Sequence, residues 1–369
     1  MDFNISKLLP LLPNGWEDKC LELGIIERRR EIKTPGDLML LCLFHLVSGC
    51  SLMDTSIAAS YLRIGEFSDV AFMKRFMACG EWFKWISSAI THKGQAKFAK
   101  PEWLSGYTVV AYDASEVKEQ GRSGQLFRLH YGLDIFNMRT VSHRITRLDI
   151  GETMLNFGLR KGFIAMGDRA YGTANGIAHC LASGADFIFR LRMDAFPVFS
   201  EKGSKIDFLE RFRKLKHGES TEFCGSIKTP EGEARKVRIC AMRKSAEECR
   251  KARERVRGTA RRKGQKLKEG TEKFNEYIVL ATSLPSGISK GEVLETYRLR
   301  WQVENYFKRL KSILGFGELP KKREEASLAW LNGKMMVALL IETLIAGSFF
   351  SLKWKKESEA EYMAGDQDG

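Results

Sequence analysis

Apolar and polar residues follow three different patterns along the chain, and each pattern predicts a different kind of structure. Within residues 1–105 apolar positions recur every three or four residues, as in helices that pack on a core. Between 106 and 192, short β-branched and aromatic runs are separated by turn residues, which predicts strands. From 294 to 315 the helical period returns with no Gly or Pro in its interior, so we expect one long helix.

The first part is expected to hold several helices. Thr34 is placed to cap a helix that runs to residue 47, and two further helices are predicted over 51–61 and 69–78. Two short helices joined by a glycine-containing turn are consistent with a helix-turn-helix-like element, in which Lys74 and Arg75 would contact DNA. An ordinary three-helix packing unit with both cations on its surface explains the same pattern.

The second part predicts three strands that can form a meander, followed by a strand, a helix and a strand. The expected ranges are 107–112, 126–136, 139–149 and 161–166 for four strands, 173–182 for the helix and 185–192 for the fifth strand. This is the element order of an RNase H-like α/β fold with a mixed five-stranded sheet. The first and fourth strands are neighbours in that fold, so Asp113 and Asp168, which follow them, can share a site. A lone Asp after a strand is otherwise a turn or helix cap.

The long helix at 294–315 has two different faces. One face is apolar and would pack on the core. The polar stripe consists of Tyr297, Arg300, Glu304 and Lys311, with Trp301 and Lys308 at its border. A solvated helix face would also show this stripe, with Glu304 and Lys308 as an i,i+4 pair worth about 0.2–0.5 kcal/mol. Trp301 could equally belong to the core or stack on an unpaired base.

Charge narrows the class of partner. The 369 residues include 60 Lys+Arg and 46 Asp+Glu, which gives a formal net charge of +14. A polyanion is therefore the expected partner, nucleic acid first and an anionic membrane second. The longest apolar runs, 38–47 and 335–350, are shorter than the roughly 20 residues that a membrane span requires. The eight cysteines form no C-x-x-C pair, so we expect no structural zinc and a reduced, cytoplasmic protein.

Residues 193–275 exceed what a minimal RNase H-like core needs. Short strands are predicted at 221–227 and 234–242, and residues 245–273 contain 11 Lys+Arg against 5 Glu. This basic stretch is either a solvated helix or an arm along the DNA backbone, which would add salt-dependent affinity and little sequence information. Residues 276–284 then return to strand character.

The literal spacing Tyr-x2-Arg-x3-Glu-x6-Lys is reproduced by Tyr297, Arg300, Glu304 and Lys311 without an insertion. Here the chain resembles the DDE transposases of the insertion-sequence-four (IS-four) group, over about residues 30–345 in element order. In that family this helix supplies the last catalytic carboxylate and cationic contacts to the transposon end. The family has two further aspartates upstream, at the positions of Asp113 and Asp168. Arg169 and Tyr171 match its D-R-x-Y pattern, whereas Ala114 stands where glycine is expected.

The resemblance implies a DNA transposase that binds transposon ends, cleaves them by metal-dependent phosphodiester hydrolysis and joins the 3′-hydroxyl ends to target DNA. Asp113, Asp168 and Glu304 would be the catalytic, metal-binding residues, for two Mg²⁺ ions that Mn²⁺ can replace. The implied DNA contacts are Tyr297, Arg300, Lys311, Lys308, Trp301, Arg169, Lys74 and Arg75; a structural salt bridge is the alternative role for Arg169. The partners would be double-stranded DNA and a second copy in a synaptic homodimer, with no membrane.

Two other functions share parts of this pattern. An RNase H-like nuclease would have the same acids but join no ends, and a non-catalytic DNA-binding protein derived from a transposase would have lost an acid. The expected organisation is a helical N-terminal DNA-binding region (1–105), an RNase H-like core (106–192 and 276–320), a β-rich basic insertion (193–275), a C-terminal helix (321–355) and a disordered tail (356–369).

Overall fold

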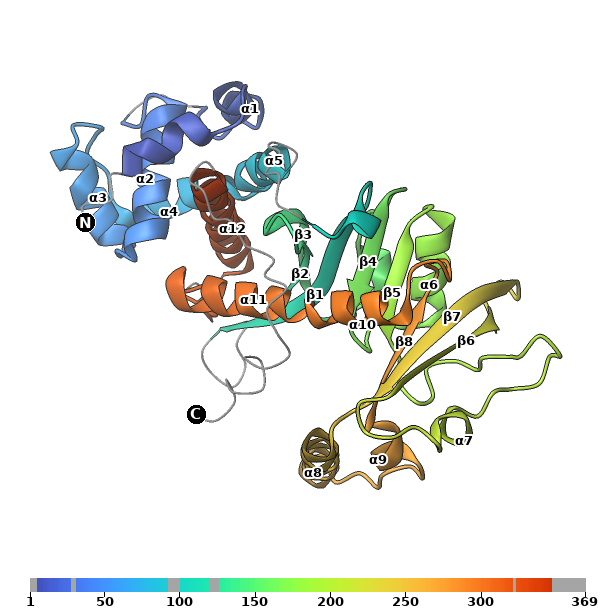
Figure 1. Ribbon diagram of the computed structural model, residues 1–369. Coiled ribbons are helices and arrows are strands. Elements are labelled where there is room, and N and C mark those ends of the chain that lie inside the picture. Colours follow the sequence, from blue (N-terminus) through green and yellow to red (C-terminus); the bar gives the residue numbers. More distant parts are fainter. Residues whose placement is uncertain (1–4, 28–30, 92–99, 120–125, 321–322, 347–369) are drawn as a thin grey trace.

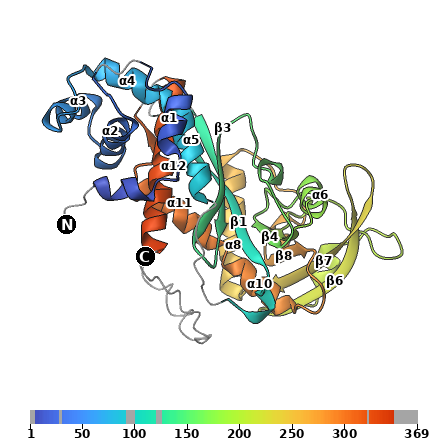
Figure 2. The ribbon, with the colours of Figure 1, turned by 90° about the horizontal axis from the view of Figure 1, so that it is seen from above.

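The computed structural model describes residues 5–27, 31–91, 100–119, 126–320 and 323–346. A twisted mixed sheet forms the middle of the molecule, with the N-terminal helices beyond one end of it and the insertion beyond the other (Figures 1 and 2). The expected disordered tail, 356–369, lies outside the described residues. In the part of the chain that is described, no helix is long and apolar enough to cross a membrane.

The sheet contains the five strands that the sequence predicts. They are β1 (Thr108–Glu119), β2 (Leu126–Asp134), β3 (Arg139–Arg147), β4 (Phe163–Gly167) and β5 (Asp186–Arg190). Their order is β3-β2-β1-β4-β5. β1 is antiparallel to β2 and parallel to β4, and β4 is parallel to β5. This meander followed by two parallel strands is the RNase H-like arrangement, which confirms the expected fold class.

The first strand is longer than its sequence suggests. We expected β1 to end before Asp113, but it continues to Glu119 and pairs with β2 throughout. Its parallel pairing with β4 stops at Tyr112, opposite Gly167. Asp113 therefore follows the end of the β1–β4 ladder and not the end of the strand. The small residues after Asp113 indicated a turn, but pairing with β2 keeps this segment extended.

The insertion does not form a separate layer. Its strands β6 (Ser220–Lys228) and β7 (Ala234–Arg243) join the same sheet through β8 (Tyr277–Thr282), in the order β5-β8-β7-β6. All three pairings are antiparallel. A short strand, β9 (Glu318–Leu319), pairs with the far end of β1. The five-stranded sheet is thus one side of a nine-stranded one, with β3 at the edge and the insertion strands beyond β5.

Short helices cap and cover the sheet. The N-terminal ones are α1 (Trp16–Glu22), α2 (Pro35–Ser48), α3 (Leu52–Tyr61), α4 (Asp69–Ala78) and α5 (Gly80–Thr91), and the central ones are α6 (Ala174–Ala182), α7 (Phe208–Phe212), α8 (Ala246–Arg262) and α9 (Thr271–Phe274). Short 3-10 helices occupy Ile5–Leu11, Glu102–Leu104 and Met154–Asn156. Thr34 and Ser68 cap α2 and α4 by accepting hydrogen bonds from backbone N–H groups, as predicted.

The predicted long helix is interrupted. Residues 290–313 form two helices, α10 (Lys290–Arg298) and α11 (Trp301–Ile313), joined through Leu299 and Arg300. At the junction the backbone N–H of Arg300 bonds to Tyr297 O at 3.0 Å, and that of Val303 bonds to Arg300 O at 3.1 Å. These i→i−3 bonds tighten the chain into a 3-10 turn. Because no Gly or Pro marks the break, the helical period alone could not reveal it.

Two apolar cores lie on opposite faces of the sheet. One joins the sheet to the N-terminal helices, α10, α11 and the last helix, α12 (Glu324–Ala346). The other holds α6, α7 and the inner face of the insertion strands. In Figure 1, α10 and α11 cross the face of the sheet that they cover, and α12 lies between α11 and the N-terminal helices. The position of α11 is therefore set by the sheet and by α12 together.

Candidate active site

Asp113 and Asp168 become neighbours through the parallel pairing of β1 and β4. Tyr112 lies opposite Gly167 in the ladder, and each aspartate comes directly after one of these two residues. Gly172 closes the turn after Asp168 against β5, because a Cβ at that position would collide with the carbonyl oxygen of Arg190. Two acids separated by 55 positions are thereby held side by side, as the expected strand order required.

Side chains along a strand alternate between the two faces of the sheet, and this alternation places Asp113 and Asp168 on the same face. Residues two and four positions before each aspartate belong to the core beneath α11; they are Val109, Ala111, Ile164 and Met166. Asp113, inside β1, continues this alternation, and Asp168 follows β4 in the same phase. Glu304 comes to the same place from α11, which packs on this face through Val303 and Phe307. The three acids thus meet between the sheet and the helix.

Local hydrogen bonds orient both aspartates. Asp113 Oδ1 accepts the backbone N–H of Ala114 at 2.8 Å, and Asp168 Oδ1 accepts that of Ala170 at 2.8 Å. Turn-forming contacts of this kind were the alternative role for an Asp after a strand. Ala114 itself pairs with His130 in a regular ladder, so alanine fits where the resembled family has glycine. Each aspartate keeps its second carboxylate oxygen for other partners.

Arg300 lies between two of the acids. Its guanidinium donates to Glu304 Oε1, and its Nη1 is 3.8 Å from Asp113 Oδ2. Burial would lower the pKa of Arg300, but Tyr297, Glu304 and Asp113 raise it above the ordinary arginine value. Among the ion pairs of the described residues, Glu304 is joined to Arg300 and not to Lys308. The pair that the alternative of a solvated helix face required is therefore absent from these ion pairs.

The electrostatics of Asp113 are those of a crowded carboxyl cluster. Burial, with smaller contributions from the negative charges of Asp168 and Glu304, raises its pKa to about 6, although the Ala114 N–H and Arg300 both act to lower it. A buried carboxylate without enough positive charge around it is a candidate for a functional site. One arginine only partly compensates three acids in this space.

The donor set fits a hard divalent cation. Three carboxylates supply the oxygen ligands that Mg²⁺ prefers, and a small number of protein ligands leaves positions for water and phosphate. Within the described ranges, no three His, Cys, Asp or Glu side chains are already close enough to hold an ion together. Mutual repulsion and the interposed Arg300 account for this spacing. A bound cation would offset the same repulsion that raises the pKa of Asp113.

A cluster of cations borders Asp168 on the side of the insertion. Arg169 donates from Nη2 to Asn275 Oδ1 at 2.8 Å, so a hydrogen bond replaces the salt bridge considered from the sequence. Burial and the nearby Arg190 lower the pKa of Arg169 to about 10. Burial together with Arg190 and Arg169 lowers the pKa of Lys244 to about 8. Three like charges are held together here with little compensation.

Sequence reasoning missed Arg190 and Lys244. Arg190 is the last residue of β5, and Lys244 directly follows β7. No motif marks either residue; the available signal was a cation at the end of a predicted strand. The Nε atoms of Arg169 and Arg190 and the hydroxyl of Tyr297 are buried, with no hydrogen-bond partner among the described residues. Burying a donor without a hydrogen-bond partner costs free energy. The oxygens of a phosphate could accept hydrogen bonds from these donors.

The remaining predicted contact residues differ in exposure. Tyr297 is 7% exposed, so the polar stripe of the predicted helix is not uniformly solvated. Trp301 is 44% exposed, which separates it from the core. Lys308 and Lys311 are exposed on α11. Trp301, Lys308 and Lys311 are thus open to solvent on α11, the helix that also carries Glu304.

The two predicted N-terminal contacts also differ from each other. Arg75 donates to the backbone oxygen of Ile25 at 3.1 Å and so ties α4 to the segment after α1. Lys74 is exposed. The exposed surface of the neighbouring α3 carries Met53, Ile57 and Tyr61, which are apolar or aromatic. Arg75 thus has a structural contact, whereas the charge of Lys74 is exposed to solvent.

Most of the chain is similar to known proteins. A family model described as "Transposase DDE domain" matches residues 104–340, which is more than half of the chain. The InsL protein of insertion sequence element IS186A from Escherichia coli (strain K12) is 29% identical over 342 residues, covering 91% of this chain and 92% of that protein. The transposase for insertion sequence element IS421 from Escherichia coli is 29% identical over 343 residues, with the same two coverages of 91% and 92%.

Among solved structures, the chain is similar to a piggyBac transposase in a synaptic complex with hairpin DNA, with a TM-score of 0.46 and 8% identity. That similarity covers 93% of this chain and 76% of the other. The family match spans Asp113, Asp168, α11 and most of α12. The chain therefore belongs to the DDE transposases, in the insertion-sequence-four group.

Proposed function

We propose that Asp113, Asp168 and Glu304 are the catalytic residues of this transposase and that they bind two Mg²⁺ ions, which Mn²⁺ can replace. The observation that carries this proposal is the meeting of three acids from β1, β4 and α11 on one face of the sheet, where the pKa of Asp113 is raised to about 6. Divalent ions bound there would activate the attacking oxygen and stabilise the leaving one.

The residues of the chain itself would position the DNA. Arg300 would leave Glu304 and turn to a phosphate, because its two present partners are those that the metal would take. The buried donors of Arg169, Arg190 and Tyr297 would bind a neighbouring phosphate, next to Asp168. The reaction frees a 3′-hydroxyl at the transposon end, and that hydroxyl then attacks another phosphodiester, with no covalent intermediate on the protein.

Surfaces farther away would hold the rest of the DNA. Lys308, Lys311 and Trp301 border the acids, with Trp301 open enough to stack on an unpaired base. We propose that the helical region 1–105, through Lys74 and Arg75, binds the terminal repeats. In the insertion, 193–275, the basic helix α8 would lie along the DNA backbone. Two ends must be brought together, so we propose a homodimer on DNA, acting in the cytoplasm.

The test is cleavage and joining of labelled DNA that carries the element's own ends. Wild-type protein is compared with Glu304→Gln, with Mg²⁺ or Ca²⁺ present, and DNA binding is measured in parallel. We expect cutting and joining by the wild type with Mg²⁺ only. Glu304→Gln should bind DNA normally and do neither, because the amide keeps the shape of the side chain and removes its charge.

Three outcomes would contradict the proposal. If Glu304→Gln cuts as well as the wild type, the polar face of α11 is only a DNA-contact surface. If the wild type cuts but never joins ends, the alternative of an RNase H-like nuclease is favoured. A wild type that binds the ends without cutting would favour the non-catalytic alternative.

A further inference from the structure

The carboxylate of Glu342 joins four elements of the fold next to the acids. It lies on α12 and accepts the backbone N–H of Thr140 at 3.1 Å and the Thr140 hydroxyl at 2.9 Å. It also accepts the hydroxyl of Tyr131 at 3.3 Å and that of Tyr306. These partners come from β3, β2 and α11, so one side chain of the last helix holds three other elements together.

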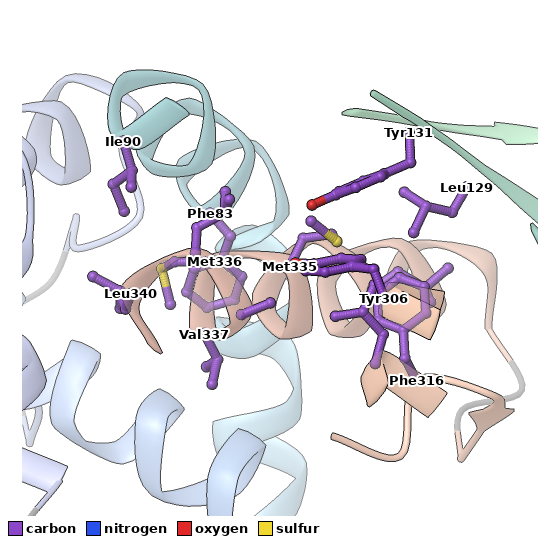
Figure 3. Close-up of a cluster of buried hydrophobic side chains, with 14 of the residues drawn as sticks. Phe83, Ile90, Leu129, Tyr131, Tyr306, Phe316, Met335, Met336, Val337 and Leu340 are labelled. Carbon is purple, nitrogen blue, oxygen red and sulfur yellow. The ribbon is translucent and has the colours of Figure 1, made fainter. Parts of the chain in front are cut away.

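The two tyrosines connect this junction to the acids. Tyr131 lies directly opposite Asp113 in the β1–β2 ladder, and residues opposite one another in an antiparallel pair share one face. Tyr306 is two residues after Glu304 on α11. The two rings are stacked, with centroids 4.6 Å apart and planes 16° apart, and both are buried (Figure 3). The stack therefore spans the distance between the strand of Asp113 and the helix of Glu304.

Among the described residues, the other features that place α11 near Asp113 are the turn before the helix, the ion pairs of Arg300 and apolar packing. α11 begins after the 3-10 turn at Leu299–Arg300, so its direction is not set by continuity with α10. Arg300 links Asp113 to Glu304, but it would leave both when DNA binds. The apolar contacts of Val303, Phe307 and Leu310 hold α11 on the sheet without a directional bond. The hydrogen bonds of Glu342 supply direction.

We propose that Glu342 is a positioning residue for catalysis: through Tyr306 and Tyr131 it sets the separation of Glu304 from Asp113. The proposal rests on the assignment of those two acids to the metal site. Glu342 touches neither substrate nor metal and acts on the register of α11 against the sheet. Removing a group that hydrogen-bonds to a metal ligand typically costs about 10–100-fold in metal affinity or activity. Glu342 acts less directly, through Tyr306 and Tyr131, so its effect should lie near the lower end of that range.

The test compares Glu342→Ala, Glu342→Gln and Tyr306→Phe with the wild type in two measurements on the full chain. The first is the Mg²⁺ concentration that gives half-maximal cleavage of transposon-end DNA. The second, made without metal or DNA, is amide hydrogen exchange of α11 relative to α5. We expect Glu342→Ala to raise the Mg²⁺ requirement about tenfold or more and to speed exchange in α11 but not in α5. Tyr306→Phe should give a smaller shift of the same kind.

The conservative variant Glu342→Gln and a control variant at Lys334 distinguish a positioning role from a general loss of stability. Glu342→Gln keeps an acceptor for Thr140, so its Mg²⁺ requirement should lie between those of the wild type and Glu342→Ala. Lys334 is the control: it is buried on the same helix, and its Nζ donates to Leu46 O at 2.6 Å, away from α11. Lys334→Met should lower thermal stability and leave both measurements unchanged.

The proposal is overturned if Glu342→Ala shifts neither measurement more than Lys334→Met does. It is also overturned if Tyr306→Phe behaves as the wild type in both measurements. Tyr306→Phe alone provides the test if Glu342→Ala does not fold. Failure of the catalytic assignment gives a different result: Glu304→Gln, run alongside, would then cut as the wild type does.

Discussion

Charged residues around the acids and charged residues on α8 are in opposite situations. Near the acids, Asp113 and Arg300 have side chains that are 18% and 17% exposed, and several pKa values are displaced by burial. On α8, Arg250 and Glu254 are 62% and 59% exposed and form an i,i+4 pair. Lys251 pairs with Glu247 in the same way, and Arg257 pairs with Glu272. The charges of α8 are exposed, whereas those of the site are partly buried.

This difference separates two ways of binding DNA. A buried cation with unsatisfied donors gains most from one phosphate in one place, which favours positioning at the reacting bond. An exposed cation on a charged helix gains through the release of counterions, which favours affinity that depends on salt. The two regions should therefore respond differently to substitution, pH and salt, and four predictions follow that difference.

The largest effect is expected for Asp113→Asn. Because the folded-state pKa of Asp113 is about 6, above the usual 3.8, the folded protein holds this proton more tightly than the unfolded chain. Without metal, wild-type stability should therefore fall as pH rises from about 4 to about 6, and the whole cost remains above that range. A shift of roughly two units corresponds to about 3 kcal/mol. Asp113→Asn should be more stable by about that amount in denaturant unfolding at pH 8 with chelator, although it should not cleave DNA.

Glu254→Gln on α8 is the matched control for that measurement. Its exposed carboxylate should give no measurable change in stability at pH 8. Equal stabilisation by both substitutions would mean that the acids near Asp113 are not an unusual cluster.

The second effect concerns Arg190. Its Nε is buried without a partner in the described part of the chain, and its charge lowers the pKa of Arg169 and Lys244. Arg190→Ala should slow cleavage of bound DNA by roughly 10²-fold, since one preorganised donor is lost. Its thermal stability should not decrease, because a repelling charge is removed as well. Arg255→Ala on α8 should change the same rate by less than about twofold, and similar losses in both variants would remove the distinction.

The third effect is a dependence on pH. The pKa of Lys244 is lowered to about 8, and only the protonated lysine attracts phosphate. DNA affinity should therefore weaken as pH rises from 7 to 9, by about three- to tenfold. Lys244→Arg should abolish this dependence, because arginine remains charged. Fluorescence anisotropy at constant ionic strength measures both proteins; an unchanged pH profile in Lys244→Arg would show that Lys244 does not contact DNA.

The smallest effect is expected from α8. Replacing Arg255, Arg261 and Arg262 with Gln should reduce the slope of log affinity against log salt by up to about 3, if each contacts one phosphate. The rate at saturating protein should be unchanged. A loss of rate at saturation would mean that α8 takes part in positioning, and an unchanged slope would mean that it is an ordinary solvated helix.

The sequence alone determined the parts that depend on local physics or on a fixed motif. The helix cap at Thr34 is visible because its side-chain oxygen must satisfy a backbone N–H within three residues. The turn between β2 and β3, and the strand–helix–strand unit that follows, are visible in short-range periodicity. Asp113, Asp168 and Glu304 could be named because the spacing around Glu304 identified a family with two upstream acids.

Only the tertiary structure decided the rest, since it depends on residues far apart in the chain. Pairing with β2 carried β1 past Asp113, and β8 brought the insertion strands into the main sheet. Arg190 and Lys244 join Arg169 from different strands, so no sequence window contains their shared charge. Glu342 meets Thr140 across 202 positions. Such contacts arise when a whole core packs at once, and a local pattern holds no record of them.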